Sequence, residues 1–168
     1  GILGMASYPT YDPTTYTEFD KAVYKNPAVA GNFEPGSTFK VLIMASGIQE
    51  KLITPTTAID EKGPVQVGDY SIRTWNNEYR GSISMTDVLR YSSNVGMVYV
   101  ANKLGKDTLL RYIRHFGFGD STGVDVEEEQ SSELRVDRDW SDIDVATASF
   151  GQGIAVTPLQ MVRAVGAL

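Results

Sequence analysis

Cysteine is missing from this chain of 168 residues, and histidine occurs only once, as His115. Without cysteine there can be no disulfide framework and no thiolate-bound metal, so a metal site would need carboxylates alone. The acidic residues between positions 125 and 144 do not have the spacing of a calcium-binding loop. We therefore predict a solvated acidic surface, no metal site and no cofactor. His115 is expected in the last turn of a helix, where it complements the helix dipole.

Long apolar runs and basic clusters are missing as well. The sequence contains neither a run of 18 apolar residues nor a signal peptide. A formal net charge of −6, with no basic patch, argues against a nucleic acid as the partner. Hydrophobic residues make up 42% and charged residues 21%, which is typical of a globular protein. A chain of this length is long enough to form one hydrophobic core.

Hydrophobic periodicity and turn residues predict a mixed α/β or α+β fold in which helices dominate. We expect a strand over residues 1–8, a long loop over 9–36, a β-hairpin over 64–75 with its turn at Gly68–Asp69, and an irregular acidic excursion over 120–144. Helices are expected over residues 37–51, 85–90, 94–104, 107–116 and 143–150, and from 158 onward.

Two of these helices have predicted buried faces. In the helix over residues 37–51 that face consists of Val41, Leu42, Met44, Ala45 and Ile48. The last helix has Thr157 as its N-cap and Pro158 as its first residue. Its apolar face consists of Leu159, Val162, Val165 and Leu168. This pattern reaches the last residue without a capping glycine, so we expect that the chain was cut from a longer protein.

The most informative motif is EPGSTFK at residues 34–40, which places Ser37 three residues before Lys40 where a helix begins. Residues i and i+3 share a helix face, so the hydroxyl and the amine are expected to point into one cleft. A serine needs a nearby base, and a lysine can be that base when burial or positive neighbours lower its pKa from about 10.4 toward 7 or 8. Backbone N–H groups at the helix start would suit a developing oxyanion.

A second motif, YSSNVG at residues 91–96, makes the first one specific. S-x-x-K followed by S-x-N is the two-part pattern of penicillin-recognising active-site serine enzymes. Together with ILGMASYP at 2–9, YDP at 11–13 and GQGIAVTPLQ at 151–160, the chain resembles the transpeptidase domain of a class B penicillin-binding protein. The resemblance covers nearly the whole chain and implies helices packed on an antiparallel sheet.

The resemblance implies four catalytic residues. Ser37 would attack the carbonyl of a D-alanyl-D-alanine stem peptide and form an acyl-enzyme. Lys40 would act as the base or as an electrostatic partner. Ser92 would relay a proton to the departing amine, because a hydroxyl both donates and accepts hydrogen bonds. Asn94 would hold the substrate amide and the lysine.

Five further residues are assigned to substrate binding: Trp75, Ser93, Gly151, Gln152 and Gly153. Trp75 is interpreted either as an aromatic wall of the cleft or as an ordinary packing residue. Ser93 is also the spacer between two catalytic positions. The two glycines do not have the spacing of a phosphate-binding loop, and would let backbone pass close to the serine helix. Glu34 is expected to brace the serine turn.

The third motif of the family, K-T/S-G, occurs nowhere in the 168 residues. In the family it follows later, on a strand that also supplies an oxyanion donor. We therefore expect residues 1–168 to be the N-terminal portion of a transpeptidase domain. By itself this portion is expected to be impaired, because losing one oxyanion donor costs about 10²–10³ in rate.

The implied function is that of a peptidoglycan D,D-transpeptidase that is acylated by β-lactams. Its place would be the extracytoplasmic face of the bacterial membrane, with a membrane anchor outside this chain and with partners in a cell-wall synthesis complex. A β-lactam sensor or a non-catalytic module of the same fold remains an alternative. A serine β-lactamase is a further one, although no E-x-x-L-N glutamate for deacylation occurs between positions 106 and 144.

Overall fold

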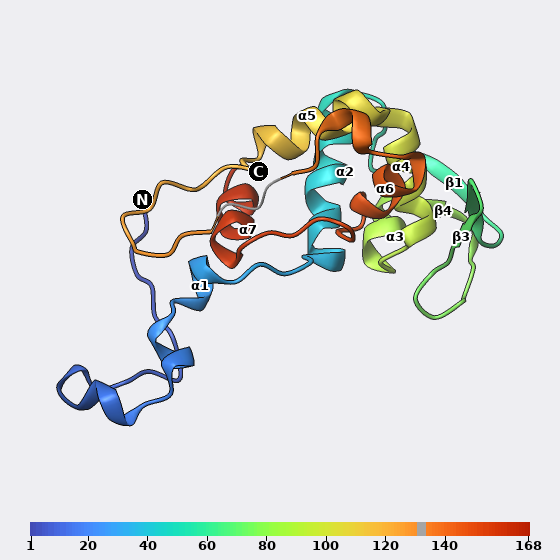
Figure 1. Cartoon of the computed structure of the whole chain (residues 1–168). Coiled ribbons are helices and arrows are strands. Elements are labelled where there is room, and N and C mark those ends of the chain that lie inside the picture. The colour runs from blue at the N-terminus through green and yellow to red at the C-terminus, as the bar shows by residue number, and fades with distance from the viewer. Residues whose placement is uncertain (131–133) are drawn as a thin grey trace.

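The computed structural model describes residues 1–130 and 134–168 as a helical body from which an N-terminal segment projects (Figure 1). The α-helices are α1 (Pro27–Ala30), α2 (Lys40–Gln49), α3 (Met85–Arg90), α4 (Asn94–Leu104), α5 (Lys106–His115), α6 (Asp142–Ala148) and α7 (Pro158–Val165). The 3₁₀ helices are η1 (Pro13–Glu18), η2 (Lys21–Tyr24), η3 (Gly36–Phe39) and η4 (Asp137–Asp139). The strands are β1 (Ala58–Glu61), β2 (Val65–Val67), β3 (Tyr70–Ile72) and β4 (Gly81–Ser84).

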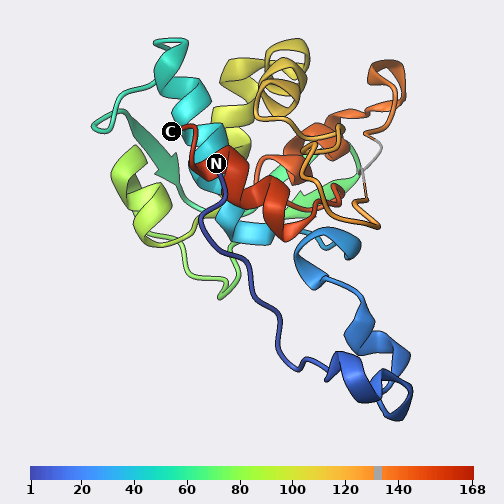
Figure 2. The ribbon, with the colours of Figure 1, turned by 90° about the vertical axis from the view of Figure 1, so that its left-hand side faces the viewer.

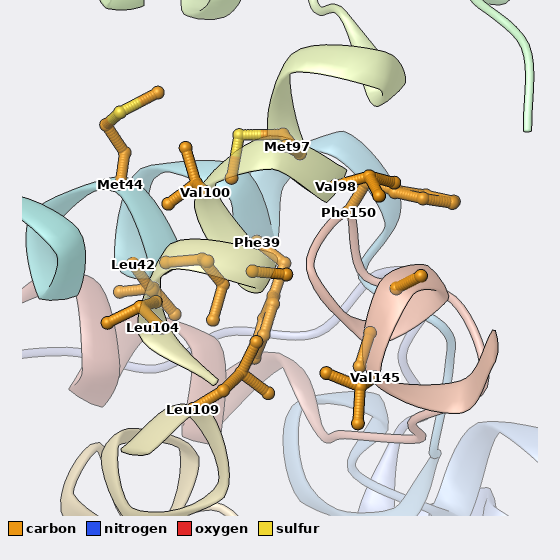
Figure 3. Close-up of a cluster of buried hydrophobic side chains, with 14 of the residues drawn as sticks. Phe39, Leu42, Met44, Met97, Val98, Val100, Leu104, Leu109, Val145 and Phe150 are labelled. Atoms are coloured by element: carbon orange, nitrogen blue, oxygen red, sulfur yellow. The ribbon is translucent and has the colours of Figure 1, made fainter. Parts of the chain in front are cut away.

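The hydrophobic core surrounds α2, which packs against α4 and α5. Figure 3 shows part of this core, where Phe39 and Leu42 lie among side chains from α4, α5 and α6. Phe39 and Leu42 are both fully buried. The predicted buried face of this helix was partly wrong, because Val41 and Ile48 are 38% and 42% exposed, whereas Ile43 is fully buried. Neighbouring helices cover a different side of α2 from the one that spacing alone indicates.

Capping side chains define where the helices of the body begin. The Ser84 side chain accepts from the backbone N–H of Asp87, whose carboxylate accepts from the Ser84 N–H, and α3 follows. Ser93 Oγ accepts from Gly96 N at 2.9 Å and starts α4. The predicted helices over 85–90 and 94–104 are confirmed at both ends. The predicted helix over 107–116 is confirmed to within one residue at each end.

The strands form two separate antiparallel pairs, so helices with small antiparallel sheets confirm the predicted α+β class. β2 and β3 are the predicted hairpin, with Val65 opposite Ile72. The pairing of β1 with β4 was not predicted. It places Ile59 opposite Ile83 and Glu61 opposite Gly81, and β1 also contacts α4.

The N-terminal segment, defined here as residues 1–28, differs from the prediction. Residues 1–8 form no strand, and they pair with no other strand in the described part of the chain. The expected loop over 9–36 contains η1, η2 and α1, which begin after the N-caps Asp12, Asp20 and Asn26. No side chain of residues 1–28 is buried. The segment begins beside the body, where Gly1 and Ile2 line a pocket with residues of α7, and it then extends away from the body (Figures 1 and 2).

The C-terminal part follows the predicted boundaries more closely than the predicted faces. The helix that was expected over 143–150 is α6, which spans Asp142–Ala148. α7 begins after the Thr157 cap, as predicted. The predicted apolar face of α7 was wrong, because Val162 is 69% exposed while Met161 and Ala164 are buried. α7 contacts α1, so segments far along the chain help to decide which side of α7 is covered.

The acidic excursion over 120–144 is largely irregular, as predicted, although residues 131–133 lie outside the described residues. It contains η4, and Trp140 is buried with its Nε1 donating to the Arg135 carbonyl at 3.1 Å.

None of the helices in the described part of the chain has the length and apolar character needed to cross a bilayer.

Candidate active site

The serine of the first motif lies on the short helix η3, directly before α2. Gly36 has a φ of +54°, which turns the chain into η3, and Ser37 follows it with an exposed side chain. Lys40 is the first residue of α2 and is only 2% exposed. In a 3₁₀ helix residues three apart lie above one another, so the hydroxyl and the amine share one side. The predicted α-helical start at residue 37 is thus a tighter turn that keeps the expected alignment.

Lys40 and the S-x-N motif are joined by a network of hydrogen bonds. Lys40 Nζ donates to Ser92 Oγ at 3.0 Å, to the Ser92 carbonyl at 2.7 Å and to Asn94 Oδ1 at 2.8 Å. Ser92 Oγ in turn lies 3.0 Å from Ser37 Oγ. The structure therefore brings together the four side chains that the sequence assigned to catalysis. A proton can move from Ser37 to Lys40 through one intervening hydroxyl.

Burial changes the protonation of the lysine. Loss of solvent around the ammonium lowers the pKa of Lys40 from 10.5 to about 8. Its three acceptors are a hydroxyl, a carbonyl and an amide oxygen, none of which carries a charge that would favour the ammonium form. About a tenth of the amines are then neutral at pH 7, so Lys40 is suited to accept a proton near physiological pH.

The S-x-N turn holds its first serine in an unusual conformation. Ser92 has a φ of +56°, a region that non-glycine residues seldom occupy. Its backbone N–H donates to the Leu89 carbonyl at 3.1 Å, and the N–H of Ser93 donates to the Val88 carbonyl at 2.9 Å. Asn94 Nδ2 donates to the Arg73 carbonyl at 3.0 Å. These bonds hold Ser92 and Asn94 toward Lys40.

Hydrogen bonds connect the loop that carries Ser37 to the segment with Gly151 and Gly153, the two glycines that were assigned to substrate binding. Gly36 N donates to the Gly151 carbonyl at 2.9 Å, and Gly153 N donates to Glu34 Oε1 at 2.9 Å. Gly151 has a φ of +78°, and a Cβ atom there would lie 2.2 Å from the Gly36 carbonyl oxygen. Glycine is therefore required where these two backbones approach. Glu34 holds the serine turn through this contact.

A pocket of about 440 Å³ opens beside the serine, within the usual size range of small-molecule sites. Its lining residues are Gly36, Ser37, Trp75, Ser92, Asn94, Phe150 and Gln152. Trp75 is 75% exposed, which fits a wall of the pocket and not a packing residue of the core. Gln152 also lines the pocket, whereas Gly151 and Gly153 act through their backbone contacts with the serine loop.

One predicted site residue does not reach the pocket. Ser93 is 2% exposed, and its Oγ donates to the carboxylate of Glu61. This placement contradicts the assignment of Ser93 to substrate binding, because its side chain points into the core. Glu61 itself was missed by the sequence analysis. The available signal was strand alternation, which places Glu61 on the same buried face as Ile59.

The described residues contain no group of three or more histidine or carboxylate side chains that could hold a metal ion. The arrangement is that of a candidate acyl-transfer site, with a serine nucleophile, a buried amine and a hydroxyl between them.

Comparison with known proteins places the chain in a family. The sequence matches the penicillin binding protein transpeptidase domain over residues 1–168, and the chain therefore belongs to that family. Stage V sporulation protein D of Bacillus subtilis is 38% identical over 168 residues, covering 99% of this chain and 26% of that protein. Peptidoglycan D,D-transpeptidase FtsI of Escherichia coli K12 is 31% identical over 162 residues, covering 96% of this chain and 27% of that protein.

A solved structure shares the fold of this chain. The crystal structure of a peptidoglycan glycosyltransferase from Burkholderia ambifaria superposes with a TM-score of 0.81 at 26% identity, covering 86% of this chain and 45% of that chain. The chain spans about a quarter of the length of the curated relatives it matches.

Proposed function

We propose that this chain carries the acylation site of a peptidoglycan D,D-transpeptidase, and that residues 1–168 are the N-terminal portion of its catalytic domain. The observation that supports this most is the hydrogen-bonded path from Ser37 Oγ through Ser92 Oγ to Lys40 Nζ, with the pKa of Lys40 lowered to about 8. Proteins of this family are named for the same reaction, as in FtsI of Escherichia coli. The proposed substrate of this chain is therefore peptidoglycan, at the D-alanyl-D-alanine end of its stem peptide.

In the proposed acylation, Ser37 Oγ attacks the carbonyl carbon between the two terminal D-alanines. Its proton passes by way of Ser92 Oγ to the neutral amine of Lys40. The C–N bond then breaks, Ser92 delivers the proton to the leaving nitrogen, and free D-alanine departs. An acceptor amine attacks the resulting ester and forms the new amide; the proton that it loses passes through Ser92 Oγ to Ser37 Oγ, which leaves as the free hydroxyl. A β-lactam enters the same path, but its amine stays attached to the acyl group and the ester persists.

The oxyanion of this reaction needs two N–H donors. The backbone N–H of Ser37 would supply one of them. No K-T/S-G motif occurs in the sequence to mark a second, so we expect slow acylation of the chain by itself.

The proposed location is the extracytoplasmic side of the bacterial membrane, where peptidoglycan is found. Cell-wall synthesis proteins are the proposed partners.

Intact-mass measurement after incubation with benzylpenicillin tests this function. We expect a one-to-one adduct on the parent chain and none on Ser37→Ala, because the ester forms on the Ser37 oxygen. Ser121→Ala is the matched control, since this serine is exposed and lies outside the pocket.

Two results would contradict the proposal. One is an adduct that survives in Ser37→Ala. The other is the absence of an adduct both on this chain and on a version extended to a strand with a Lys-Thr-Gly motif. A slow adduct on the chain that becomes fast in the extended version would support both the function and the proposed role of the second donor.

A further inference from the structure

A buried carboxylate lies directly behind the S-x-N turn. Glu61, the last residue of β1, is 1% exposed. Burying a carboxylate is costly unless hydrogen bonds or a positive charge compensate it. No ion pair involves Glu61 among the residues that the structure describes; instead, its Oε1 accepts a hydrogen bond from Ser93 Oγ. This carboxylate plays no part in the proposed acyl transfer, so its position calls for an explanation.

Ser93 is held by hydrogen bonds through its side chain and its backbone. Its Oγ has one proton, which it donates to Glu61, and the same oxygen accepts from Gly96 N at 2.9 Å. Its backbone N–H donates to the Val88 carbonyl at 2.9 Å. Among the hydrogen bonds of Ser93 in the described part of the chain, the bond to Glu61 is the only one that reaches outside the α3–α4 region. Glu61 therefore connects this turn to the β1–β4 pair, where it lies opposite Gly81.

Fixing Ser93 fixes two catalytic groups, because it lies between them in the chain. The Ser92 carbonyl, which accepts from Lys40 Nζ at 2.7 Å, belongs to the same peptide unit as the Ser93 N–H. Asn94, which follows Ser93, accepts from the same amine at 2.8 Å. Ser92 also has a φ of +56°, and such conformations persist only when the surroundings hold them.

We propose that Glu61 is a positioning residue for acylation: it holds Ser93 in place and thereby keeps the Ser92 carbonyl, Ser92 Oγ and Asn94 Oδ1 directed at Lys40. This inference rests on the proposed function for its kinetic consequence, although the placement of the turn can be measured separately. The required chemistry is a hydrogen-bond acceptor at residue 61, because Ser93 is the donor.

The kinetic test uses the rate constant for acylation by a chromogenic β-lactam, measured on folded protein. Glu61→Ala removes the acceptor, and we expect acylation to slow by about 10- to 100-fold, the size of effect that a misplacement of about 1 Å produces. Glu61→Gln keeps an acceptor oxygen of the same reach and should restore the rate to within a few-fold of the parent. Ile59→Ala is the matched control, since Ile59 is buried on the same face of β1 without a hydrogen bond to the turn.

A double-mutant comparison keeps the proposal testable if Glu61→Ala folds poorly. Ser93→Ala should slow acylation as well, and adding Glu61→Gln to it should change the rate no further, because the two residues act through one bond. Equal slowing by Ile59→Ala and Glu61→Ala at the same loss of melting temperature would overturn the proposal. So would a Glu61→Ala variant that is acylated like the parent.

A structural readout separates this inference from the proposed function. We expect the backbone amide resonances of Ser92 and Asn94 to move in Glu61→Ala and to stay near their parent positions in Glu61→Gln and Ile59→Ala. If neither the parent chain nor the version extended to a Lys-Thr-Gly motif is acylated, the proposed function fails, while these resonances still decide whether Glu61 positions the turn. Unmoved resonances in Glu61→Ala would overturn the inference.

Discussion

The helical body and the N-terminal segment are ordered by different forces. In the body, side chains such as Phe39 and Leu42 are fully buried, and helices from distant parts of the sequence cover them. In residues 1–28 no side chain is buried, and order comes from caps such as Asp12 and Asp20 and from ring contacts such as that of Tyr11 with Tyr24. Local signals are enough to form short helices. In contrast, the packed body is required to hold Ser92 within hydrogen-bonding distance of both Ser37 and Lys40.

The largest expected effect compares two phenylalanines. Phe39 is fully buried beside Phe118, with ring centroids 5.2 Å apart, whereas Phe19 is 37% exposed beside Tyr11. Phe39→Ala should lower the free energy of unfolding by about 3–5 kcal/mol, because it removes a large core side chain and leaves a cavity. Phe19→Ala should lower it by about 1 kcal/mol or less.

Urea unfolding followed by circular dichroism measures both variants. If the two substitutions had equal effects, the contrast between the body and the N-terminal segment would be wrong. Leu42→Ala, at a second fully buried position, should fall with Phe39→Ala.

The next effect compares two glycines. A Cβ atom at Gly151 would overlap the Gly36 carbonyl, and the residue has a positive φ, whereas a Cβ atom at Gly4 meets no atom within 4 Å. Gly151→Ala should cost about 2–4 kcal/mol of stability, as the sum of backbone strain and overpacking. It should also slow β-lactam acylation by about 100-fold, because Gly36 precedes Ser37. Gly4→Ala should change stability by no more than about 0.5 kcal/mol.

Parallel unfolding and acylation measurements on these two variants check the prediction. A Gly151→Ala variant that is acylated at the parent rate would show that the serine loop does not depend on its contact with this segment.

The smallest effect concerns the pH dependence of the acylation rate, and it compares Lys40 with Lys25. Burial lowers the pKa of Lys40 to about 8, and its neutral form is the one that accepts a proton. The rate of acylation should therefore rise about tenfold per pH unit below about pH 8 and level off above it. Lys25 is exposed in the N-terminal segment, so Lys25→Met should leave this profile unchanged. Stopped-flow acylation between pH 6 and 9 gives the profile, and a flat one would remove Lys40 from the role of base.

The sequence predicted best what depends on neighbouring residues. Capping residues such as Ser84 and Thr157 defined helix starts, because a cap satisfies backbone groups only two or three residues away. The spacing of Ser37 and Lys40 predicted their alignment for the same reason. The buried faces of the helices were harder to predict. Periodicity indicated that Val41 and Val162 are buried, but both are exposed, because segments far along the chain determine which side of a helix is covered.

The parts of the site that sequence reasoning missed all involve long-range contacts. The pairing of β1 with β4 places Glu61 beneath Ser93. No sequence motif at either residue indicates that the two are in contact. Ser93 was assigned to substrate binding because it lies between two motif residues, although successive residues of a turn point in different directions. The lowered pKa of Lys40 was foreseen as a requirement for a base, although the burial that causes it is a property of the folded chain.

The contact between the serine loop and residues 151–156 also bears on the order in which the protein is made. Phe33 pairs with Val156, and the bond from Gly153 to Glu34 spans 119 positions of the chain. A ribosome adds about 5–20 residues each second, so the serine loop waits several seconds after its own synthesis for the segment that completes it. Closing so long a loop is entropically costly and slow compared with forming the capped helices. The nucleophile should therefore be among the last parts of the body to reach its final place.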